Sequence, residues 1–141
     1  MTVVSKASTA WKGDLFNGSG TTTLDTPGLA TFDVSWKART EPGGGTTNPE
    51  ELIAAAHASC FSMAFSNELA NNGTPPTSLD THAEVSFVPG TGITGIALRV
   101  PAKVDGLSEE DFQRIAEAAR TGCPVSQALA AVDITLEATL A

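Results

Sequence analysis

Alternating apolar and polar residues predict β-strands in the first third of the chain. Runs rich in Thr, Val and aromatic residues occupy 3–11, 18–25 and 29–37, and turn-forming residues separate them at 12–14 and 26–28. Short connections of this kind join neighbouring antiparallel strands. We therefore expect a three-stranded antiparallel meander.

A Gly- and Pro-rich segment at 38–47 is predicted to form a flexible loop, and Arg39 is its one arginine. A helix start follows, because Asn48 suits a cap and Pro49 the first helical position, and two acidic residues come next. The predicted helix runs to about Asn71. The residues at 52–65 are small or apolar nearly throughout, which predicts burial on most faces.

The remainder of the chain predicts a second sheet layer with two further helices. Alternating runs at 79–88 and 93–100 are joined by a Pro-Gly-Thr-Gly turn and predict a hairpin. An amphipathic helix is expected from Ser108 to Gly122, and a short helix after Pro124 would leave Cys123 at its N-terminus, a position that lowers a thiol pKa. A last strand is expected at 132–140. This order of elements predicts an α+β fold.

Length and composition narrow the class of protein. The 141 residues suit one domain spanning 1–141. A net charge of -8, with scattered Lys and Arg, argues against a nucleic-acid partner. No apolar stretch approaches the ~20 residues of a membrane span, and the first residues lack the order of a secretory signal. We expect a cytoplasmic protein that does not associate with membranes.

Two cysteines are candidates for chemistry, although each has an inert alternative. Cys60 lies within the small-residue helix, where a packed core thiol is an equally simple interpretation. Cys123 is a candidate because of its expected place at a helix start. Two cysteines are too few for a disulfide scaffold, and their spacing alone does not establish a pairing.

Three further residues are candidates for a role near Cys60. Arg39 is suited to stabilise a thiolate or a peroxide oxygen, or is an ordinary solvated arginine. Glu50 lies about 15 Å along the helix axis from Cys60, too far for contact. It is suited to hold an arginine by a bidentate pairing, or acts only on the helix dipole.

His57 comes three residues before Cys60 and therefore neighbours it on the helix surface. It is either a partner in a thiolate–imidazolium pair or a hydrogen-bonding group in a core or interface. Together with His82 the chain has two His and two Cys, but no CxxC or HxxxH spacing. A metal site is not expected.

Two blocks resemble the cysteine motifs of the OsmC/Ohr (organic hydroperoxide resistance) family. The sequence TNPEELIAAAHASCFSMA at 47–64 resembles the first motif, and GCPVSQAL at 122–129 resembles the second. The order of strands and helices is similar over essentially the whole chain. The residues Ala56, His57 and Ala58, with those of 11–14, resemble the osmotically inducible OsmC branch most.

The resemblance implies both a fold and an activity. The fold is a single OsmC-like domain with two antiparallel β-sheet layers around central helices, in an intertwined homodimer. The activity is reduction of organic hydroperoxides and hydrogen peroxide without a metal, flavin or haem cofactor. Cys60 corresponds to the peroxidatic cysteine, Cys123 to the resolving one, Arg39 to the activating arginine and Glu50 to its carboxylate partner. A dithiol, with dihydrolipoyl groups in one branch, would reduce the disulfide.

Two other functions stay open at this point. One is a non-enzymatic thiol redox sensor or a ligand-binding dimer of the same fold. The other is an acyl-transfer enzyme that uses Cys60 as nucleophile and His57 as base. Steady-state turnover separates the sensor from the peroxidase, and the effect of replacing His57 tests the acyl-transfer hypothesis.

Overall fold

The structure is a computed structural model, and it describes residues 1–26 and 28–141. Contacts between residues divide the chain into two compact units, Met1–Leu52 and Ile53–Ala141, which are described separately below. A single domain over 1–141 therefore stays a prediction. The turn expected at 26–28 includes Pro27, which lies outside the described residues.

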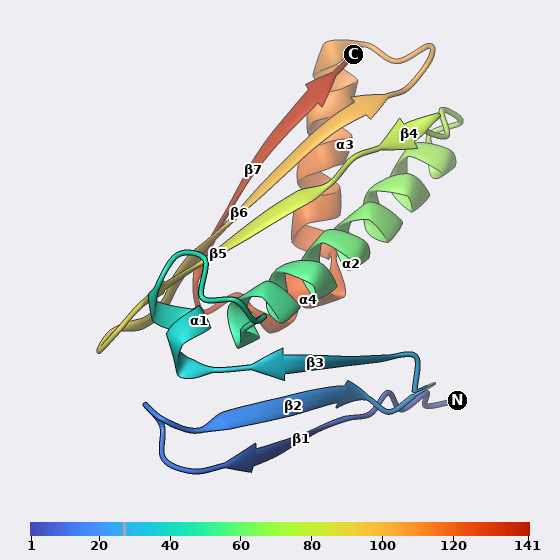
Figure 1. The fold of residues 1–141 in the computed structure, drawn as a ribbon. Helices are drawn as coiled ribbons and strands as arrows, with labels where there is room; N and C mark the ends of the chain where they lie inside the picture. The colour runs from blue at the N-terminus through green and yellow to red at the C-terminus, as the bar shows by residue number, and fades with distance from the viewer. Residues whose placement is uncertain (27) are drawn as a thin grey trace. The chain divides into compact units, whose positions relative to one another are not determined.

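The unit Met1–Leu52 contains the predicted meander. Strands β1 (Ala7–Lys12), β2 (Ser19–Leu24) and β3 (Ala30–Val34) form an antiparallel sheet in that order (Figure 1). The register pairs Thr9 with Thr22, whose hydroxyl oxygens lie 2.8 Å apart. Short Gly-containing turns keep sequential strands adjacent, which is why this part of the topology was predictable.

A short helix, α1 (Trp36–Thr40), replaces the expected end of the third strand and the start of the flexible loop. Ser35 caps it, because its side chain accepts a hydrogen bond from the Ala38 N–H at 3.2 Å. The helix-breaking residues begin only at Pro42, so one helical turn fits before them. Arg39 thus lies on a capped helix, and its placement in a flexible loop was wrong.

Helix α2 (Pro49–Asn71) begins and ends as predicted. Its cap is Asn48, whose side-chain oxygen accepts a hydrogen bond from the Glu51 N–H at 2.8 Å. Residues spaced four apart, which share one helix face, are fully buried: His57, Phe61, Phe65 and Leu69. The opposite face is exposed within this chain and includes Ala55, Ala56, Ser59 and Met63. Within this chain α2 is therefore fully buried on one face only, whereas burial on most faces was predicted.

The unit Ile53–Ala141 contains a four-stranded sheet of β4 (Ser78–Leu79), β5 (His82–Val88), β6 (Gly92–Lys103) and β7 (Asp133–Leu140). The first strand of the expected hairpin is broken at Asp80 and Thr81. Strands β4 and β5 both pair antiparallel with β6, whereas β7 pairs parallel with it. This departure from an antiparallel layer follows from the helices between β6 and β7, because a helical crossover returns the chain in the same direction.

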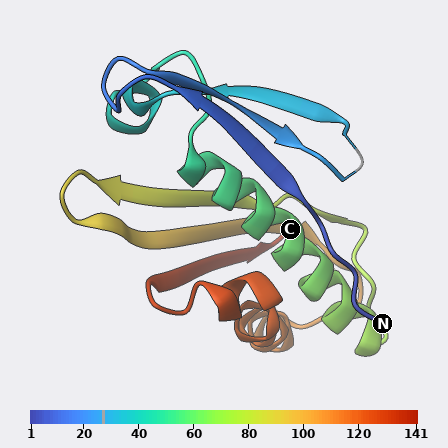
Figure 2. The same cartoon turned by 90° about the horizontal axis from the view of Figure 1, so that it is seen from below.

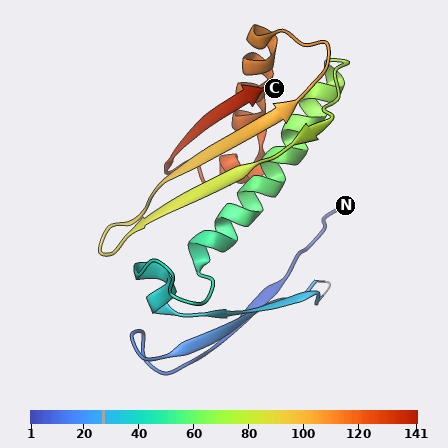
Figure 3. The same ribbon diagram turned by 45° about the horizontal axis from the view of Figure 1, so that its top comes forward.

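One face of this sheet is covered by α2 and α3 (Glu109–Gly122) (Figures 1 and 3). Alternate residues of β6 are buried in the core with residues of both helices, as expected for period-2 alternation. Phe65 links the helices, because its ring centroid lies 5.5 Å from those of Phe61 and Phe112. None of the helices in the described ranges is both long and apolar enough to cross a membrane.

Candidate active site

Cys123 lies at the junction of two helices. It ends α3, donating its backbone N–H to the Ala119 carbonyl at 2.9 Å, and it begins α4 (Pro124–Ala128) (Figure 2). Pro124 suits the first helical position because it has no N–H to satisfy there. The Cys123 side chain is fully buried. Its predicted place at the start of a short helix is confirmed.

Cys60 meets Cys123 from α2. Both are free thiols, Cys60 half-buried and Cys123 buried, and they lie close enough for each to shift the pKa of the other. Cys60 lies on α2 and Cys123 between α3 and α4, and β4, β5, β6 and α3 separate them in sequence, so only the tertiary fold brings them together. The arrangement places one thiol within reach of solvent and a second thiol behind it.

The two thiols differ in their electrostatics. Burial raises the pKa of Cys60, and the neighbouring Cys123 thiol raises it further, against the opposing effect of the Val125 N–H. Burial also acts to raise the pKa of Cys123, but the Ser126 N–H, the Cys60 thiol and the Ser126 hydroxyl together lower it. A thiolate shared by this pair is therefore favoured on Cys123.

The groups at the start of α4 act on the Cys123 sulfur mainly as nearby dipoles. Its side chain makes no capping hydrogen bond to the α4 backbone. The backbone and hydroxyl of Ser126 nevertheless act to lower the pKa of this thiol, which favours its anionic form. The predicted lowering of a thiol pKa at this helix start is thus confirmed in direction.

His57 makes its hydrogen bond across the helices and not along its own. Its Nε2 lies 2.7 Å from the hydroxyl oxygen of Ser126, and both side chains are buried. Nδ1 has no hydrogen-bond partner among the described residues. Burial lowers the pKa of His57, so the ring is neutral near neutral pH. The hypothesis of a thiolate–imidazolium pair with Cys60 is therefore wrong, because His57 is neutral and pairs with Ser126.

Arg39 and Glu50 form a second pair, within the unit Met1–Leu52. The Arg39 Nε and Nη2 atoms lie 2.9 and 2.8 Å from one carboxylate oxygen, Oε1 of Glu50. The guanidinium carbon also lies 5.8 Å from the centre of the Trp36 ring, a cation–π distance. The structure thus brings Arg39 and Glu50 together, and their part in catalysis stays a prediction.

An apolar cavity of about 340 Å³ lies beside Arg39 in the same unit. Most of its wall is apolar, formed by Trp11, Leu15, Val34, Trp36, Pro49 and Leu52. The guanidinium supplies a cation at this wall. Such a cavity suits a molecule with an apolar body and a polar or anionic end.

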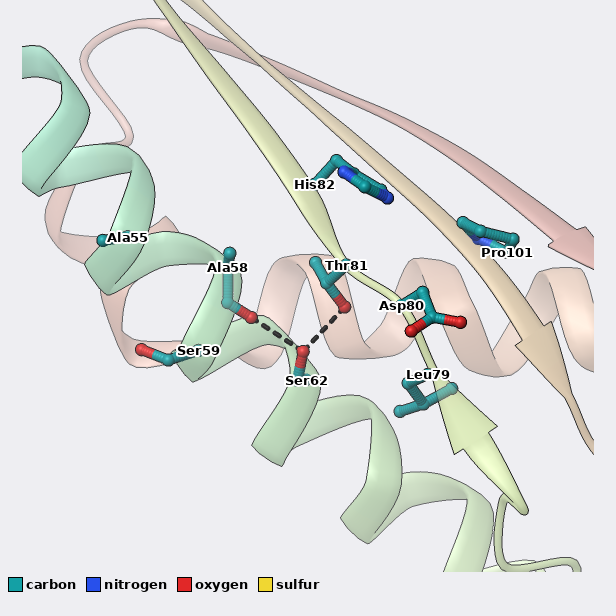
Figure 4. A pocket seen from close by; sticks show the side chains of 9 residues that line it. All are labelled: Ala55, Ala58, Ser59, Ser62, Leu79, Asp80, Thr81, His82 and Pro101. Atoms are coloured by element: carbon teal, nitrogen blue, oxygen red, sulfur yellow. Dashed lines mark hydrogen bonds between the residues drawn. The ribbon is translucent and has the colours of Figure 1, made fainter.

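A wider hollow, of about 780 Å³, lies between α2 and the strands β4, β5 and β6 (Figure 4). The Ser62 hydroxyl lies 2.8 Å from the Ala58 carbonyl oxygen and 2.6 Å from the Thr81 hydroxyl oxygen. His82 and Asp80 also line it. Because neither cysteine is among its lining residues, this hollow is separate from the thiol pair.

Metal-ligating side chains do not gather in the described residues. No group of three or more His, Cys, Asp or Glu there converges on a point that an ion would occupy. The two histidines and two cysteines noted in the sequence include one exposed strand residue, His82.

Comparison with known proteins shows the family to which the chain belongs. The family model described as OsmC-like protein matches residues 42–137, a span that includes both cysteines and Glu50. The chain belongs to the OsmC-like family. Peroxiredoxin OsmC of Escherichia coli is 44% identical over 140 residues, covering 97% of this chain and 96% of the relative. The organic hydroperoxide resistance protein of Xanthomonas axonopodis is 32% identical over 100 residues, covering 67% and 68%.

Solved structures of OsmC-like proteins share the fold. The organic hydroperoxide resistance protein OsmC of Legionella pneumophila has a TM-score of 0.70 at 26% identity, covering 98% of this chain and 99% of its own. OhrB of Bacillus subtilis has a TM-score of 0.68 at 26% identity, covering 95% and 98%. The resemblance to the OsmC/Ohr family and the predicted α+β fold are confirmed.

Ser126 is the site residue that sequence reasoning missed. It lies three residues after Cys123, so the two share one turn of a helix that begins at Pro124. That spacing was a usable signal, because a hydroxyl one turn from a helix-start cysteine can point at its sulfur. The pairing of Ser126 with His57 depends on the packing of α4 against α2 and has no sequence signal.

Proposed function

We propose that this chain is a thiol-dependent peroxidase. It reduces organic hydroperoxides and hydrogen peroxide through a Cys60 sulfenic acid and then a Cys60–Cys123 disulfide. The observation that supports this most strongly is that a half-buried thiol and a buried one lie close enough to shift the pKa of each other. Relatives named peroxiredoxin and organic hydroperoxide resistance protein support the same assignment.

Cys60 is the nucleophile in this proposal, because it is the thiol that solvent reaches. Its thiolate attacks one peroxide oxygen, the O–O bond breaks, and the sulfur becomes a sulfenic acid while the second oxygen leaves as an alkoxide or hydroxide. The leaving oxygen takes a proton and departs as an alcohol or water. The peroxide is thereby reduced by two electrons, which the sulfur supplies.

Cys123 resolves the sulfenic acid. Its thiolate attacks the Cys60 sulfur, the S–O bond breaks, and the hydroxide that leaves is protonated to water. The lowered pKa of Cys123 suits this role, since the attacking species is a thiolate. An external dithiol, such as a dihydrolipoyl group, then reduces the disulfide by two successive thiol exchanges.

Arg39 supplies the activation that Cys60 needs. Burial raises the pKa of Cys60, and a cation acting on its sulfur would favour the thiolate at neutral pH. Arg39 is a suitable cation because Glu50, which is 5% exposed, holds the guanidinium from one side. The apolar cavity beside Arg39 would accommodate the organic part of a hydroperoxide.

The active form in this proposal is a cytoplasmic homodimer. The exposed face of α2 consists mostly of small residues and also presents Met63, which is 73% exposed. Within the unit Met1–Leu52, Phe16 and Leu29 are exposed as well. Large apolar side chains exposed in this number favour a protein–protein interface. A reducing cytoplasm would also supply the dithiol.

Steady-state consumption of cumene hydroperoxide with dihydrolipoamide as reductant tests the proposal. Repeated turnover by the wild type, and none by Cys60→Ser, is the expected result. A redox sensor would consume one equivalent and stop, and an acyl-transfer enzyme would consume none. Either result would contradict the peroxidase assignment.

A further inference from the structure

A buried polar pair joins the two cysteine-bearing helices. His57 and Ser126 are 0% and 5% exposed, and their hydrogen bond joins residues 69 positions apart in sequence. A buried polar contact of this kind is costly unless it is satisfied, so its placement beside the thiols needs a reason. Ser126 supplies one, because it lies in the first turn of α4 directly after Cys123 and its hydroxyl acts to lower the pKa of that thiol.

The direction of the hydrogen bond follows from the unpartnered Nδ1. If Nε2 accepted from Ser126, the ring proton would lie on Nδ1, which has no acceptor among the described residues. Buried N–H groups without an acceptor are the rarer kind of unsatisfied group. The proton is therefore assigned to Nε2, which donates to the Ser126 oxygen, and this assignment rests on the neighbours of the ring.

With its oxygen already accepting from His57, the Ser126 hydroxyl is free to donate elsewhere. Ser126 lies in the first turn of α4, three residues after Cys123, and its hydroxyl acts to lower the pKa of that thiol, so the Cys123 sulfur is the acceptor that we assign to it. We propose that His57 and Ser126 form a buried donor chain, from imidazole N–H to hydroxyl to sulfur, that orients and holds the Cys123 thiolate for the resolving step. Both are positioning residues, and this role rests on the proposed peroxidase function.

The donor chain acts at one step of the cycle. As Cys123 attacks the Cys60 sulfur, the S–O bond of the sulfenic acid breaks, and the departing hydroxide becomes water by taking a proton. The two sulfurs are joined and no other group is oxidised or reduced. The hydroxyl of Ser126 holds the thiolate until the S–S bond forms, so its loss should slow the disulfide and leave sulfenic acid formation unchanged.

A neutral donor fits the site better than a base. Burial disfavours the imidazolium form of His57, and no carboxylate of the described residues is hydrogen-bonded to its ring. The titratable groups that act on Cys123 are Cys60 from α2 and, through Ser126, His57. A glutamine places an amide N–H near the position of Nε2 but cannot titrate, so His57→Gln separates the two roles.

Single-turnover oxidation by cumene hydroperoxide, quenched and followed by intact mass, tests the proposal in wild type, Ser126→Ala, His57→Leu and His57→Gln. At about pH 7, Ser126→Ala and His57→Leu should form the disulfide roughly tenfold more slowly, as for loss of a hydrogen bond to a charged group. Formation of the Cys60 sulfenic acid should be unchanged. His57→Gln should stay close to wild type. The difference in the rate of disulfide formation between these variants and the wild type should become smaller at high pH, where Cys123 is deprotonated even without the hydrogen bond.

Matched controls are Ser62→Ala, a half-buried helical serine outside the thiol site, and His82→Gln, an exposed strand histidine. Disulfide formation at the wild-type rate in both Ser126→Ala and His57→Leu would overturn the proposal. Equal slowing in His57→Leu and His57→Gln would also overturn it, because a base and not a donor would then be required.

A second measurement does not depend on peroxidase activity. In a Cys60→Ser background, thiolate absorbance reports the ionisation of Cys123 alone. Adding Ser126→Ala should move that titration to higher pH, and adding His57→Gln should leave it nearly in place. An unmoved titration in the Ser126→Ala variant contradicts the donor chain. If the titration moves but the wild type forms no sulfenic acid, the proposed function fails instead.

Discussion

Arg39 and Glu50 meet through a single carboxylate oxygen, Oε1, which lies 2.9 Å from Nε and 2.8 Å from Nη2 of the arginine. The Glu50 side chain is 6% exposed and that of Arg39 is 29% exposed. One end of the pair is thus fixed in the protein interior while the guanidinium lies at the wall of the apolar cavity. A cation held in this way is preorganised to stabilise a developing negative charge.

Arg39→Ala should lower kcat/KM for cumene hydroperoxide by roughly a hundredfold, the usual loss on removing one preorganised charge-stabilising donor. Arg39→Lys should restore little, because an ammonium group lacks the planar fork that meets the carboxylate. Lys37→Ala is the matched control, since Lys37 lies on the same helix and pairs with Glu41 in solvent. An unchanged rate in Arg39→Ala would refute the activation step.

Glu50→Gln should lower the same rate by less than Arg39→Ala does. The amide keeps the shape of the side chain but loses the charge that orients the guanidinium, so Arg39 remains present and less ordered. Glu51→Gln, in the same helical turn but exposed, should behave as wild type. Steady-state kinetics of the three proteins measure this, and a Glu50→Gln enzyme as fast as wild type would show that the orientation is set elsewhere.

Phe65 is expected to dominate the packing of α2 on α3. It is fully buried and contacts two other rings, so Phe65→Ala should lower the free energy of unfolding by about 3–5 kcal/mol. Val88→Ala, at an exposed strand end, should change it by no more than about 0.5 kcal/mol. Urea unfolding at one fixed protein concentration compares the two variants, and similar losses would contradict this account of the core.

His57 should make the protein less stable in mild acid. Burial lowers its pKa below the ordinary value of 6.5, so between the two values the unfolded chain binds more protons than the folded one. The free energy of unfolding should therefore fall as the pH drops below about 6.5. His57→Gln has no proton to gain and should show a shallower fall between about pH 7.5 and pH 5. Parallel curves for the two proteins would show that His57 is not buried as a neutral ring.

Local sequence signals were sufficient where structure is set by neighbouring residues. The cap at Asn48 with Pro49 specified the start of α2, and Pro124 specified the start of α4. Local sequence signals failed to predict α1, because one helical turn between a strand and a glycine run has too few residues for a periodic pattern. The parallel pairing of β7 was also missed, since strand direction depends on how the crossover packs.

The candidate site also has residues that the sequence predicted and contacts that it did not. Cys60, Glu50 and Cys123 were proposed from two sequence blocks and Arg39 from the segment before them, and the structure brings Arg39 to Glu50 and Cys60 to Cys123. Ser126 and the true partner of His57 were missed, because their hydrogen bond joins helices that are distant in sequence. A histidine three residues from a cysteine suggested a local pair, whereas burial and packing turned the ring toward α4.

The order of oxidation of the two cysteines is the central claim. Intact-mass analysis after one equivalent of cumene hydroperoxide, with and without dimedone, tests it most directly in wild type, Cys60→Ser and Cys123→Ser. We predict a loss of two hydrogens in wild type, a dimedone adduct at Cys60 in Cys123→Ser and no oxidation in Cys60→Ser. A dimedone adduct at Cys123 in Cys60→Ser, with Cys123→Ser left unoxidised, would contradict the account.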